Sequence, residues 1–415
     1  MAEKFAFVEQ VVMAGHIVDS LLLSKVVDAI QVRGGQYNID SLRLGDRSDD
    51  PSEAVIEVRA ETPARLDALL AEIHSHGAVP VHTRDAALAP ADLAGAFPDG
   101  FYCTANFRTQ VRLHGEWVEV EDQEMDCGLL ADPEGLAVRC VPMTGVQVGD
   151  AIVVGRGGVR VFPPEAEGRK RNLFEFMAGP VSSERPKGVT VREIAKAMRH
   201  AKAAGEKILA VLGPAVVHTG GGEHVAELVR RGYVQVIFAG NAFATHDIEQ
   251  ALYGTSLGVS LDHGLPTDEG HEHHLRTINT VRRLGGIPQA VAAGRLTSGV
   301  MFECVTRGIP AVLCGSIRDD GPLPEVITDA LEAQAEMRKH VPGVGFCLMV
   351  ATTLHSIAVG NLLPAWVKVA CIDISPATVT KLMDRGTTQT VGIVSDAEPF
   401  LRALVAELAK GGPEA

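Results

Sequence analysis

Residues 345–373 read GFCLMVATTLHSIAVGNLLPAWVKVACID, in which two apolar runs flank a segment rich in small residues. The runs 345–350 and 367–372 have the length of buried strands, and the residues between them follow a helical pattern. Strands that are apolar throughout and alternate with helices are typical of a parallel sheet covered on both faces. This stretch therefore predicts that the C-terminal part of the chain is an α/β domain with a parallel sheet.

The same alternation extends over residues 188–415. Six apolar runs are predicted to be strands, each followed by a helical pattern: 208–212, 234–239, 311–313, 345–350, 367–372 and 390–394. In an open parallel sheet, ligands bind beyond the carboxyl ends of the strands. The residues that follow these runs are small or polar in nearly every case, so we look for a site among them.

Asp373 is the most informative residue at these strand ends. A carboxylate that ends a buried strand can accept both hydroxyls of an adenosine ribose, which favours a dinucleotide such as NAD. The alternative is that Asp373 caps the helix that begins at Pro376, although Ser375 occupies the better N-cap position. Further strand-end residues are predicted to complete a rim for the amide, ribose and phosphates of a dinucleotide: Asn241, Ala242, Asp319, Asp320, Thr352, Thr353, Leu354, His355, Asp396 and Ala397.

The loop of residues 213–222, GPAVVHTGGG, follows one predicted strand and opens a helix. Its backbone N–H groups could hold a phosphate, but a triple glycine is equally suited to a flexible turn. Both interpretations stay open.

Four histidines lie close together in the sequence at positions 263, 271, 273 and 274. The string HEHH differs from the zinc motif HExxH, and no cysteine or carboxylate stands at a recognisable ligand spacing. We therefore expect no metal ion. These imidazoles are expected to donate to a substrate or to cap a helix over residues 275–284.

The first 85 residues have a pattern of their own. Strand-like runs at 5–13, 37–44, 54–58 and 79–81 are separated by two segments with helical spacing of apolar residues. Asp19 or Ser20 is expected to cap the first helix and Thr62-Pro63 to open the second. The order β-α-β-β-α-β predicts a ferredoxin-like fold, which is shared by modules of many functions.

Residues 86–187 show a third pattern, in which short strand-like segments are separated by glycine, proline and acidic turns. We expect a small, mostly β domain there. The predicted organisation is therefore a ferredoxin-like domain at 1–85, a β domain at 86–187 and an α/β domain at 188–415.

Composition limits the possible partners. The 415 residues suggest two or three domains at about 150 residues each, and 38 Lys+Arg against 52 Asp+Glu give a net charge of −14. With no basic stripe, nucleic acid and anionic membranes are disfavoured. The seven cysteines show no paired spacing and the N-terminus shows no signal peptide, so we expect a cytoplasmic protein with reduced thiols.

Several longer strings carry a family resemblance. They are QEMDCG at 123–128, FEFM at 174–177, VSSERP at 181–186, AGNA at 239–242, GHEHHL at 270–275, CGSIRDDGPLP at 314–324, LHSIAVGN at 354–361 and VTKLMDRG at 379–386. With these strings the chain resembles the archaeal-type ornithine cyclodeaminase family, also described through its lysine-oxoglutarate reductase/saccharopine dehydrogenase conserved region. The resemblance spans nearly the whole chain.

The resemblance implies a Rossmann-like, NAD-binding C-terminal domain similar to deoxyhypusine synthase, an ACT-like N-terminal domain, and conversion of L-ornithine to L-proline and ammonia. We also expect a homo-oligomer. Some relatives carry an arginine dihydrolase domain in front, for which residues 1–85 leave no room.

The implied reaction needs a cation for the substrate carboxylate and a base for an ammonium group. Within the matched strings, Asp126, Glu184 and Arg185 are expected to face the nicotinamide across a domain cleft. Alternatively, Glu184 and Arg185 form a structural ion pair. The α/β domain also offers Asp319, Asp320, Lys381 and Arg385. Two other functions stay open, an NAD-dependent dehydrogenase of lysine-like amino acids and a non-catalytic regulator that responds to NAD or an amino acid.

Overall fold

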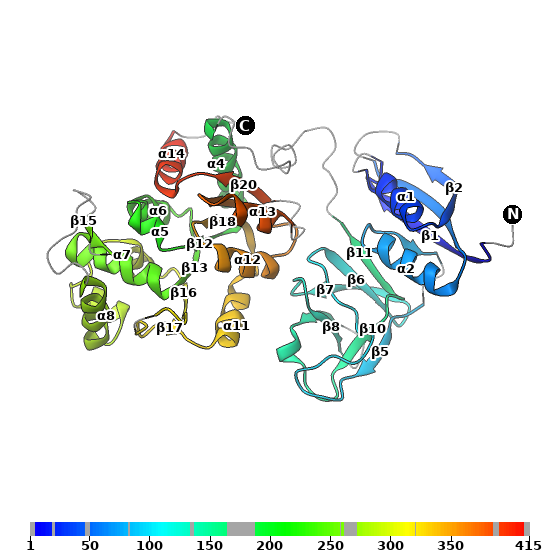
Figure 1. Ribbon diagram of the computed structural model, residues 1–415, viewed down its shortest axis with the longest axis horizontal. Helices are drawn as coiled ribbons and strands as arrows, with labels where there is room; N and C mark the ends of the chain where they lie inside the picture. Colours follow the sequence, from blue (N-terminus) through cyan, green and yellow to red (C-terminus); the bar gives the residue numbers. More distant parts are fainter. Residues whose placement is uncertain are drawn as a thin grey trace. The chain divides into compact units, whose positions relative to one another are not determined.

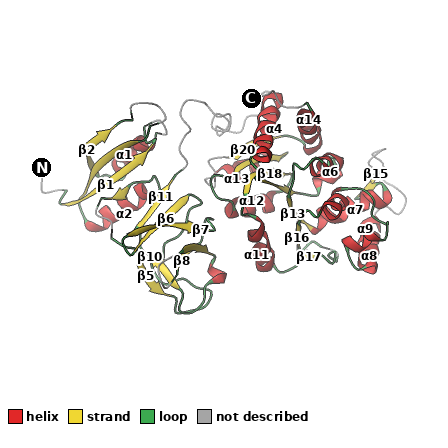
Figure 2. Ribbon diagram, turned by 180° about the vertical axis from the view of Figure 1, so that it is seen from behind, coloured by secondary structure: helices red, strands yellow, loops and turns green. Residues whose placement is uncertain are grey.

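The computed structural model (Figures 1 and 2) describes residues 5–18, 21–45, 50–81, 84–132, 137–163, 187–257, 259–260, 272–319, 321–384 and 390–410. The chain divides into two units. The first comprises Met1–Glu175 with Leu363–Trp366, and the second comprises Phe176–Leu362 with Val367–Ala415. In the first unit, the N–H of Ala365 donates to the carbonyl oxygen of Asn106, which ties the short segment 363–366 to the N-terminal part of the chain (2.9 Å).

The N-terminal part of the first unit has the predicted β-α-β-β-α-β order. Its elements are β1 (Phe7–Gly15), α1 (Leu22–Val32), β2 (Gln36–Arg43), β3 (Ser52–Ala60), α2 (Pro63–His74) and β4 (Val79–Pro80). The antiparallel sheet has the order β2-β3-β1-β4. This arrangement confirms the ferredoxin-like prediction.

Alternation along the strands builds the core of this sheet. Alternate residues in the second half of β1 and along β3, such as Val11 and Ile56, are buried in one cluster with apolar residues of the two helices, such as Ile30 and Leu69. Thr62 caps α2 as predicted, since its Oγ1 accepts the N–H of Arg65 (3.2 Å).

The cap predicted for α1 is different. Leu21, with φ 58°, occupies the N-cap position and provides no side-chain hydrogen bond, so the chain enters α1 through a left-handed residue. Asp19 and Ser20 lie outside the described residues.

The rest of the first unit is mostly β, as predicted. Its elements are β5 (Ala87–Pro90), β6 (Arg108–Leu113), β7 (Glu116–Glu121), β8 (Gly128–Ala131), β9 (Val138–Val141), a 3-10 turn (Met143–Gly145), β10 (Ala151–Val154) and β11 (Val159–Phe162). They form a sheet in the order β11-β6-β7-β9-β8-β10-β5. Its main core contains Val111, Leu129, Val153 and Val159.

The second unit contains a seven-stranded parallel sheet in the order β17-β16-β13-β12-β18-β19-β20. The strands are β12 (Lys207–Leu212), β13 (Val236–Gly240), β16 (Ala311–Cys314), β17 (Val326–Ile327), β18 (Val344–Val350), β19 (Lys368–Asp373) and β20 (Thr390–Val394). The six predicted strands are confirmed. The sequence analysis missed β17, a two-residue strand too short for an apolar run, and wrongly expected a helix directly after β16.

Helices connect these strands. They are α4 (Lys187–Ala203), α5 (Ala215–His218), α6 (Gly222–Arg230), α7 (Asn241–Tyr253), α8 (His273–Leu284), α9 (Ile287–Ala292), α10 (Val300–Arg307), α11 (Ala330–His340), α12 (Thr353–Leu362), α13 (Pro376–Asp384) and α14 (Ala397–Ala409). Between α7 and α8 lies a small hairpin of β14 (Thr255–Ser256) and β15 (Val259–Ser260). None of the described helices is long and apolar enough to cross a membrane.

The strand order places a switch point beside β12. The chain runs from β12 through β13 to β16 in one direction along the sheet, and later from β18 through β19 to β20 in the other. With right-handed connections, helices α5 to α10 and helices α12 and α13 therefore cover opposite faces of the sheet (Figure 1). Ligands of such sheets bind at the carboxyl ends of the strands where the direction changes, which is between β12 and β18.

Candidate functional site

Backbone meets backbone at the switch point. The N–H of Gly213, directly after β12, donates to the carbonyl oxygen of Val350 at the end of β18 (3.0 Å). A Cβ on Gly213 would lie 1.8 Å from the carbonyl oxygen of Ala351, which has a φ of 52°. Only glycine fits here, because a Cβ atom would collide with the backbone at the end of β18. A ligand of a sheet with this topology binds just outside these two strand ends.

The N-terminus of α12 follows the end of β18 and carries four predicted residues. Thr353 contacts Thr378 of α13 through their hydroxyl groups (2.8 Å), while the side chain of Leu354 is 82% exposed. His355 reaches the end of β13, which lies beyond β12 in the sheet, since its Cε1 lies 3.3 Å from where a Cβ of Gly240 would stand. Burial lowers the pKa of His355, so the ring is neutral at pH 7. Thr352 directly precedes the helix, whose first N–H groups can hold a phosphate.

The loop 213–222 is less suited to hold a phosphate. Residues 215–218 form α5, and each N–H from residue 216 to residue 221 already donates to a carbonyl oxygen of residues 213–217. A phosphate would have to displace these bonds. Of the two segments, the start of α12 therefore fits a phosphate better.

Asp373 ends β19 as predicted, with 8% of its surface exposed. Its Oδ1 accepts the N–H of Ser375, so one carboxylate oxygen holds the turn into α13 (2.8 Å). Because Ser375 precedes the helix, this bond closes a turn before α13 and does not cap one of the helix N–H groups. Together with burial, this carboxylate raises the pKa of the neighbouring Cys371 thiol to about 12. The ribose contact of Asp373 stays a prediction.

Asn241 and Ala242 begin α7 directly after β13. The side chain of Asn241 is buried, and its Oδ1 accepts the N–H of Leu323 (3.0 Å). This amide therefore fixes the segment that follows β16. In the same segment, Oδ2 of Asp319 accepts the N–H of Ser316 and closes a tight turn (2.7 Å). Asp320 lies outside the described residues.

Asp396 and Ala397 follow β20, the strand next to β19. Asp396 occupies the N-cap position of α14 without a side-chain cap and is exposed, whereas Ala397 is buried as the first helical residue. The N–H of Ser395 donates to the carbonyl oxygen of Asp373, which joins the ends of β19 and β20 (3.1 Å). Contacts between neighbouring strand ends thus bring the predicted rim residues to one edge of the sheet.

Asp126 belongs to the first unit and lies in the connection between β7 and β8 with a φ of 62°. Its N–H donates to the carbonyl oxygen of Thr104 (3.0 Å), and the Thr104 hydroxyl accepts the N–H of Cys127 (3.0 Å). The buried Glu124 accepts a hydrogen bond from the Cys127 thiol (3.1 Å). A compact polar cluster therefore fixes this left-handed turn.

The other residues expected to act on the substrate cannot be placed. Glu184 and Arg185, with Arg385, His263 and His271, lie outside the described residues. Lys381 of α13 is exposed. Among the described residues, no group of three or more His, Cys, Asp or Glu side chains is arranged to hold a metal ion.

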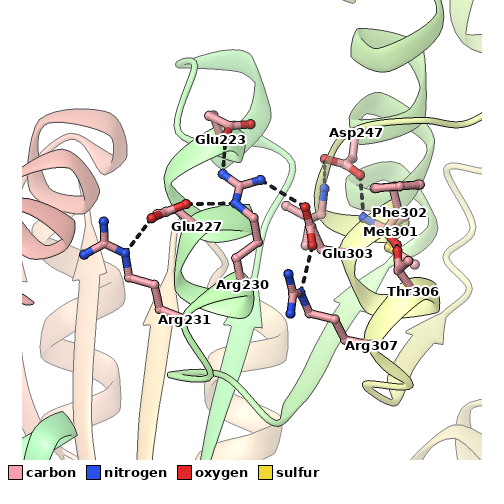
Figure 3. A network of polar contacts seen from close by, with 11 residues as sticks. Glu223, Glu227, Arg230, Arg231, Asp247, Met301, Phe302, Glu303, Thr306 and Arg307 are labelled. Atoms are coloured by element: carbon pink, nitrogen blue, oxygen red, sulfur yellow. Dashed lines mark hydrogen bonds and ion pairs between the residues drawn. The ribbon is translucent and has the colours of Figure 1, made fainter. Parts of the chain in front are cut away.

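An ion-pair network fixes the helices that support the end of β13 (Figure 3). Arg230 of α6 pairs with Glu223, with Glu227 (2.8 Å) and with Glu303 of α10 (3.0 Å). Asp247 of α7 accepts the N–H groups of Val300 (2.9 Å) and Met301 (2.8 Å), and so caps α10 from outside. These contacts tie α6, α7 and α10 together.

The sequence analysis missed one group of polar residues near this network, around His246 and Glu249 of α7. Their spacing of three residues on one helix was a visible signal, because such residues share a helix face. Its partners come from other segments, and their proximity is visible only in the structure.

Comparison with known proteins assigns the three regions of the chain to described families. Residues 8–107 match the LOR/SDH bifunctional enzyme conserved region. Residues 108–191 match the first region of the arginine dihydrolase ArgZ-like C-terminal part, and residues 192–404 match its Rossmann-fold region.

Relatives match over nearly the whole chain. A protein of Methanopyrus kandleri named ornithine cyclodeaminase is 51% identical over 400 residues, which is 96% of this chain and 97% of the relative. The crystal structure of ArgZ, an arginine dihydrolase from the ornithine-ammonia cycle in cyanobacteria, is similar with a TM-score of 0.83 and 38% identity. The ternary complex of AgrE with ornithine and NAD+ is similar with a TM-score of 0.54 and 40% identity. This chain is covered to 97% in both comparisons and spans 58% of the length of those two chains.

Proposed function

The chain belongs to the ornithine cyclodeaminase family that shares the ArgZ-like C-terminal region, and we propose that it converts L-ornithine to L-proline and ammonia with NAD as its cofactor. The observation that carries this proposal is the switch point between β12 and β18, where Gly213 packs directly against the backbone of Ala351. It lies at the position where doubly wound sheets bind dinucleotides. AgrE, a relative at 40% identity, has been crystallised with ornithine and NAD+.

NAD, when bound, supplies reversible two-electron oxidation of the substrate's α-carbon. In our proposal the residues of this chain hold it in three ways. Asp373 accepts the ribose hydroxyls, the first N–H groups of α12 hold phosphate oxygens, and His355 with Asn241 lines the ends of β13 and β18. The buried strand β18 forms an apolar wall behind them and keeps water away from the reacting carbon.

The substrate contacts are proposed from residue type and family match. Arg185 is proposed to bind the substrate carboxylate, because guanidinium and carboxylate pair in a fixed, bidentate geometry. Asp126 and Glu184 are proposed to hold the ammonium groups. The left-handed backbone at Asp126 supports this proposed role of its carboxylate, since strained backbone is concentrated at functional sites.

We propose further that the protein is cytoplasmic, assembles from identical subunits, carries an ACT-like N-terminal domain and serves proline biosynthesis at the expense of ornithine. The free cysteines support a cytoplasmic location, because none of the seven forms a disulfide and six of them are buried. Assembly from identical subunits is supported by β2, an edge strand that exposes the apolar residues Ile39 and Leu42.

The test is incubation of the purified protein with ornithine and a catalytic amount of NAD+. We expect proline and ammonia in equal amounts, far exceeding the NAD+ added, without accumulation of NADH. Accumulated NADH would instead indicate an amino-acid dehydrogenase. Absence of both proline and NADH, with NAD still bound, would indicate a regulator.

A further inference from the structure

Histidines from three helices gather beside the end of the sheet, and the proposed site does not use them. They are His218 at the end of α5, His246 on α7, and His273 and His274 at the start of α8. The rings of His218 and His246 lie 4.7 Å apart, and those of His246 and His274 lie 6.4 Å apart. With Glu249, Thr255 and Ser256 we call this group the imidazole cluster. Because α5 follows β12 and α7 follows β13, the cluster belongs to the same carboxyl edge as the switch point.

Glu249 is the centre of the cluster. Its side chain is 0% exposed. Among the described contacts, Oε1 accepts from the Thr255 hydroxyl (2.9 Å), and Oε2 accepts from Nδ1 of His246 (2.7 Å) and from the N–H of Leu257 (3.3 Å). A carboxylate buried this completely needs such donors to compensate for lost hydration. The surrounding residues therefore supply what an ionised Glu249 requires.

This carboxylate fixes the protons on two of the rings. A carboxylate only accepts, so Nδ1 of His246 must carry the proton, and Nε2 of the neutral ring keeps its lone pair. Thr255 gives its single hydroxyl proton to Glu249, so in its contact with Nδ1 of His273 the imidazole is the donor (2.8 Å). Two imidazoles thus have proton-accepting Nε2 atoms, an arrangement that carboxylate–histidine pairs produce in proton-transfer sites.

His246 is the ring best placed to take up a proton. Its side chain is 9% exposed while Glu249 is fully buried, and no hydrogen bond to its Nε2 exists among the described residues. His218 instead bonds to the Ser256 hydroxyl through Nδ1 (2.7 Å). Burial, and then the proximity of His246, lower the pKa of His218 to about 4, so it stays neutral at pH 7. A proton entering the cluster is therefore best placed on His246, beside the carboxylate.

The backbone of α7 at His246 is also anchored on the side that faces α10. Asp247, the next residue, holds the N-terminus of α10 (Figure 3). A Cβ on Gly299 would lie 2.9 Å from its Oδ2. Anchored helices keep acid–base groups in position better than loops do. The network of Figure 3 thus fixes the segment from which His246 and Glu249 project.

We propose that His246 is the acid–base residue for the ammonium groups of the substrate and that Glu249 is its positioning residue. This inference rests on the proposed function. Once the α-carbon is at the imine oxidation level, the δ-ammonium of ornithine must lose one proton before its nitrogen bonds to that carbon. Before ammonia leaves, the α-nitrogen must gain a proton and the positively charged ring nitrogen must lose one. In our proposal Nε2 of His246 accepts the first proton and gives it to the α-nitrogen, then accepts the proton of the ring nitrogen and returns it to that nitrogen after the ring is reduced to proline. Glu249 offsets the charge of the intermediate imidazolium.

The test compares His246→Asn, which keeps a donor for Glu249 but has no Nε2, with the wild type and with the surface control His200→Asn on α4. General acid–base catalysis contributes about 10²–10⁴-fold, so we expect His246→Asn to lower kcat at least 100-fold. Calorimetry should show ornithine and NAD affinities within threefold of the wild type. The acidic limb of the pH profile of kcat/KM should be lost in this variant, and Glu249→Gln should shift it.

A second variant separates catalysis from folding. His246→Ala leaves room for a free imidazole, and added imidazole should restore part of its activity. The inference is overturned if His246→Asn keeps kcat within threefold of the wild type, or if its acidic limb is unchanged. It is also overturned if both variants lose activity without imidazole rescue while binding ornithine and NAD normally. A wild-type protein that forms no proline would overturn the proposed function itself, a result visible before any variant is made.

Discussion

A Cβ atom on Gly213 would lie 1.8 Å from the carbonyl oxygen of Ala351, so the ends of β12 and β18 meet through their backbones alone. Gly213→Ala must push these strand ends apart, because the colliding atom is backbone and cannot rotate away. We expect at least a tenfold loss of NAD affinity by calorimetry and a lower Tm. Gly188→Ala is the matched control, since its Cβ would meet only Arg192 at 3.7 Å and it lies in helix α4. If Gly213→Ala binds NAD with unchanged affinity, NAD does not bind at the ends of β12 and β18.

Asp373 gives a prediction about cofactor choice. A carboxylate accepts two ribose hydroxyls but repels a 2′-phosphate, so NAD should bind better than NADP. Hydrogen bonds to charged groups contribute about 1.5–3 kcal/mol, so Asp373→Asn should weaken NAD about 10- to 100-fold while its amide oxygen can still accept the N–H of Ser375.

The control for Asp373 is Asp329→Asn. Asp329 caps α11 by accepting the N–H groups of Leu331 and Glu332, and asparagine caps a helix about as well as aspartate, so this variant should change neither Tm nor NAD affinity measurably. If Asp373→Asn binds NAD and NADP as the wild type does, Asp373 only holds the turn into α13.

The residues that made the fold predictable are the long apolar runs. Strands such as β12 and β18 are buried along nearly their whole length, and burial of that kind leaves an uninterrupted apolar run in the sequence. The two residues of β17 carry no such signal, because its pairing with β16 depends on the loop between them. The left-handed Leu21 at the start of α1 was equally invisible, since the residue type does not favour that conformation.

The candidate site was predictable only as far as topology decides it. Knowing that parallel strands end at one edge was enough to select Asn241, His355 and Asp373. The contacts of Gly213 with Ala351 and of Asn241 with Leu323 join segments far apart in the sequence, and no local pattern reports them. Likewise, the partners of His246 and Glu249 lie on the hairpin and on α8.

Asp247 gives a pH dependence of stability. Burial raises the pKa of this carboxyl group from 3.8 to about 6, against the lowering effect of its bonds to Met301 and Val300. The folded state therefore binds a proton more readily than the unfolded state. The resulting stabilisation is fully present below pH 3.8 and is lost as the pH rises through 6.

Asp247→Asn removes this titration and should gain stability relative to the wild type as the pH rises from 4 to 7. The relative change is on the order of 3 kcal/mol, measured by urea unfolding at several pH values. Glu336→Gln is the control, because Glu336 of α11 pairs with Lys339, which lowers its pKa instead of raising it, so this variant should not gain stability relative to the wild type over the same pH range. A constant difference between Asp247→Asn and wild type over this range would contradict a raised pKa.

The last prediction concerns the α-carbon of the substrate. In the proposed reaction this carbon is oxidised and then reduced again, and the cofactor is regenerated in each cycle. If the cofactor stays bound between the two steps and the second transfer occurs on the face used by the first, proline formed from α-deuterated ornithine and unlabelled NAD+ should carry deuterium at its α-carbon. The side chains of β18 from Phe346 to Val350 are buried. Exclusion of water by these apolar side chains favours retention of the deuterium label.

Mass spectrometry of the proline measures the label, and the same reaction with excess unlabelled NADH is the matched control. A label that is retained without NADH and diluted with it means that the cofactor exchanges between the steps. Complete loss of the label in both reactions would mean that the α-hydrogen leaves as a proton that exchanges with solvent, so that no hydride is carried from ornithine to proline. In that case a dinucleotide bound near Gly213 and Asp373 would take part in a reaction different from the one proposed.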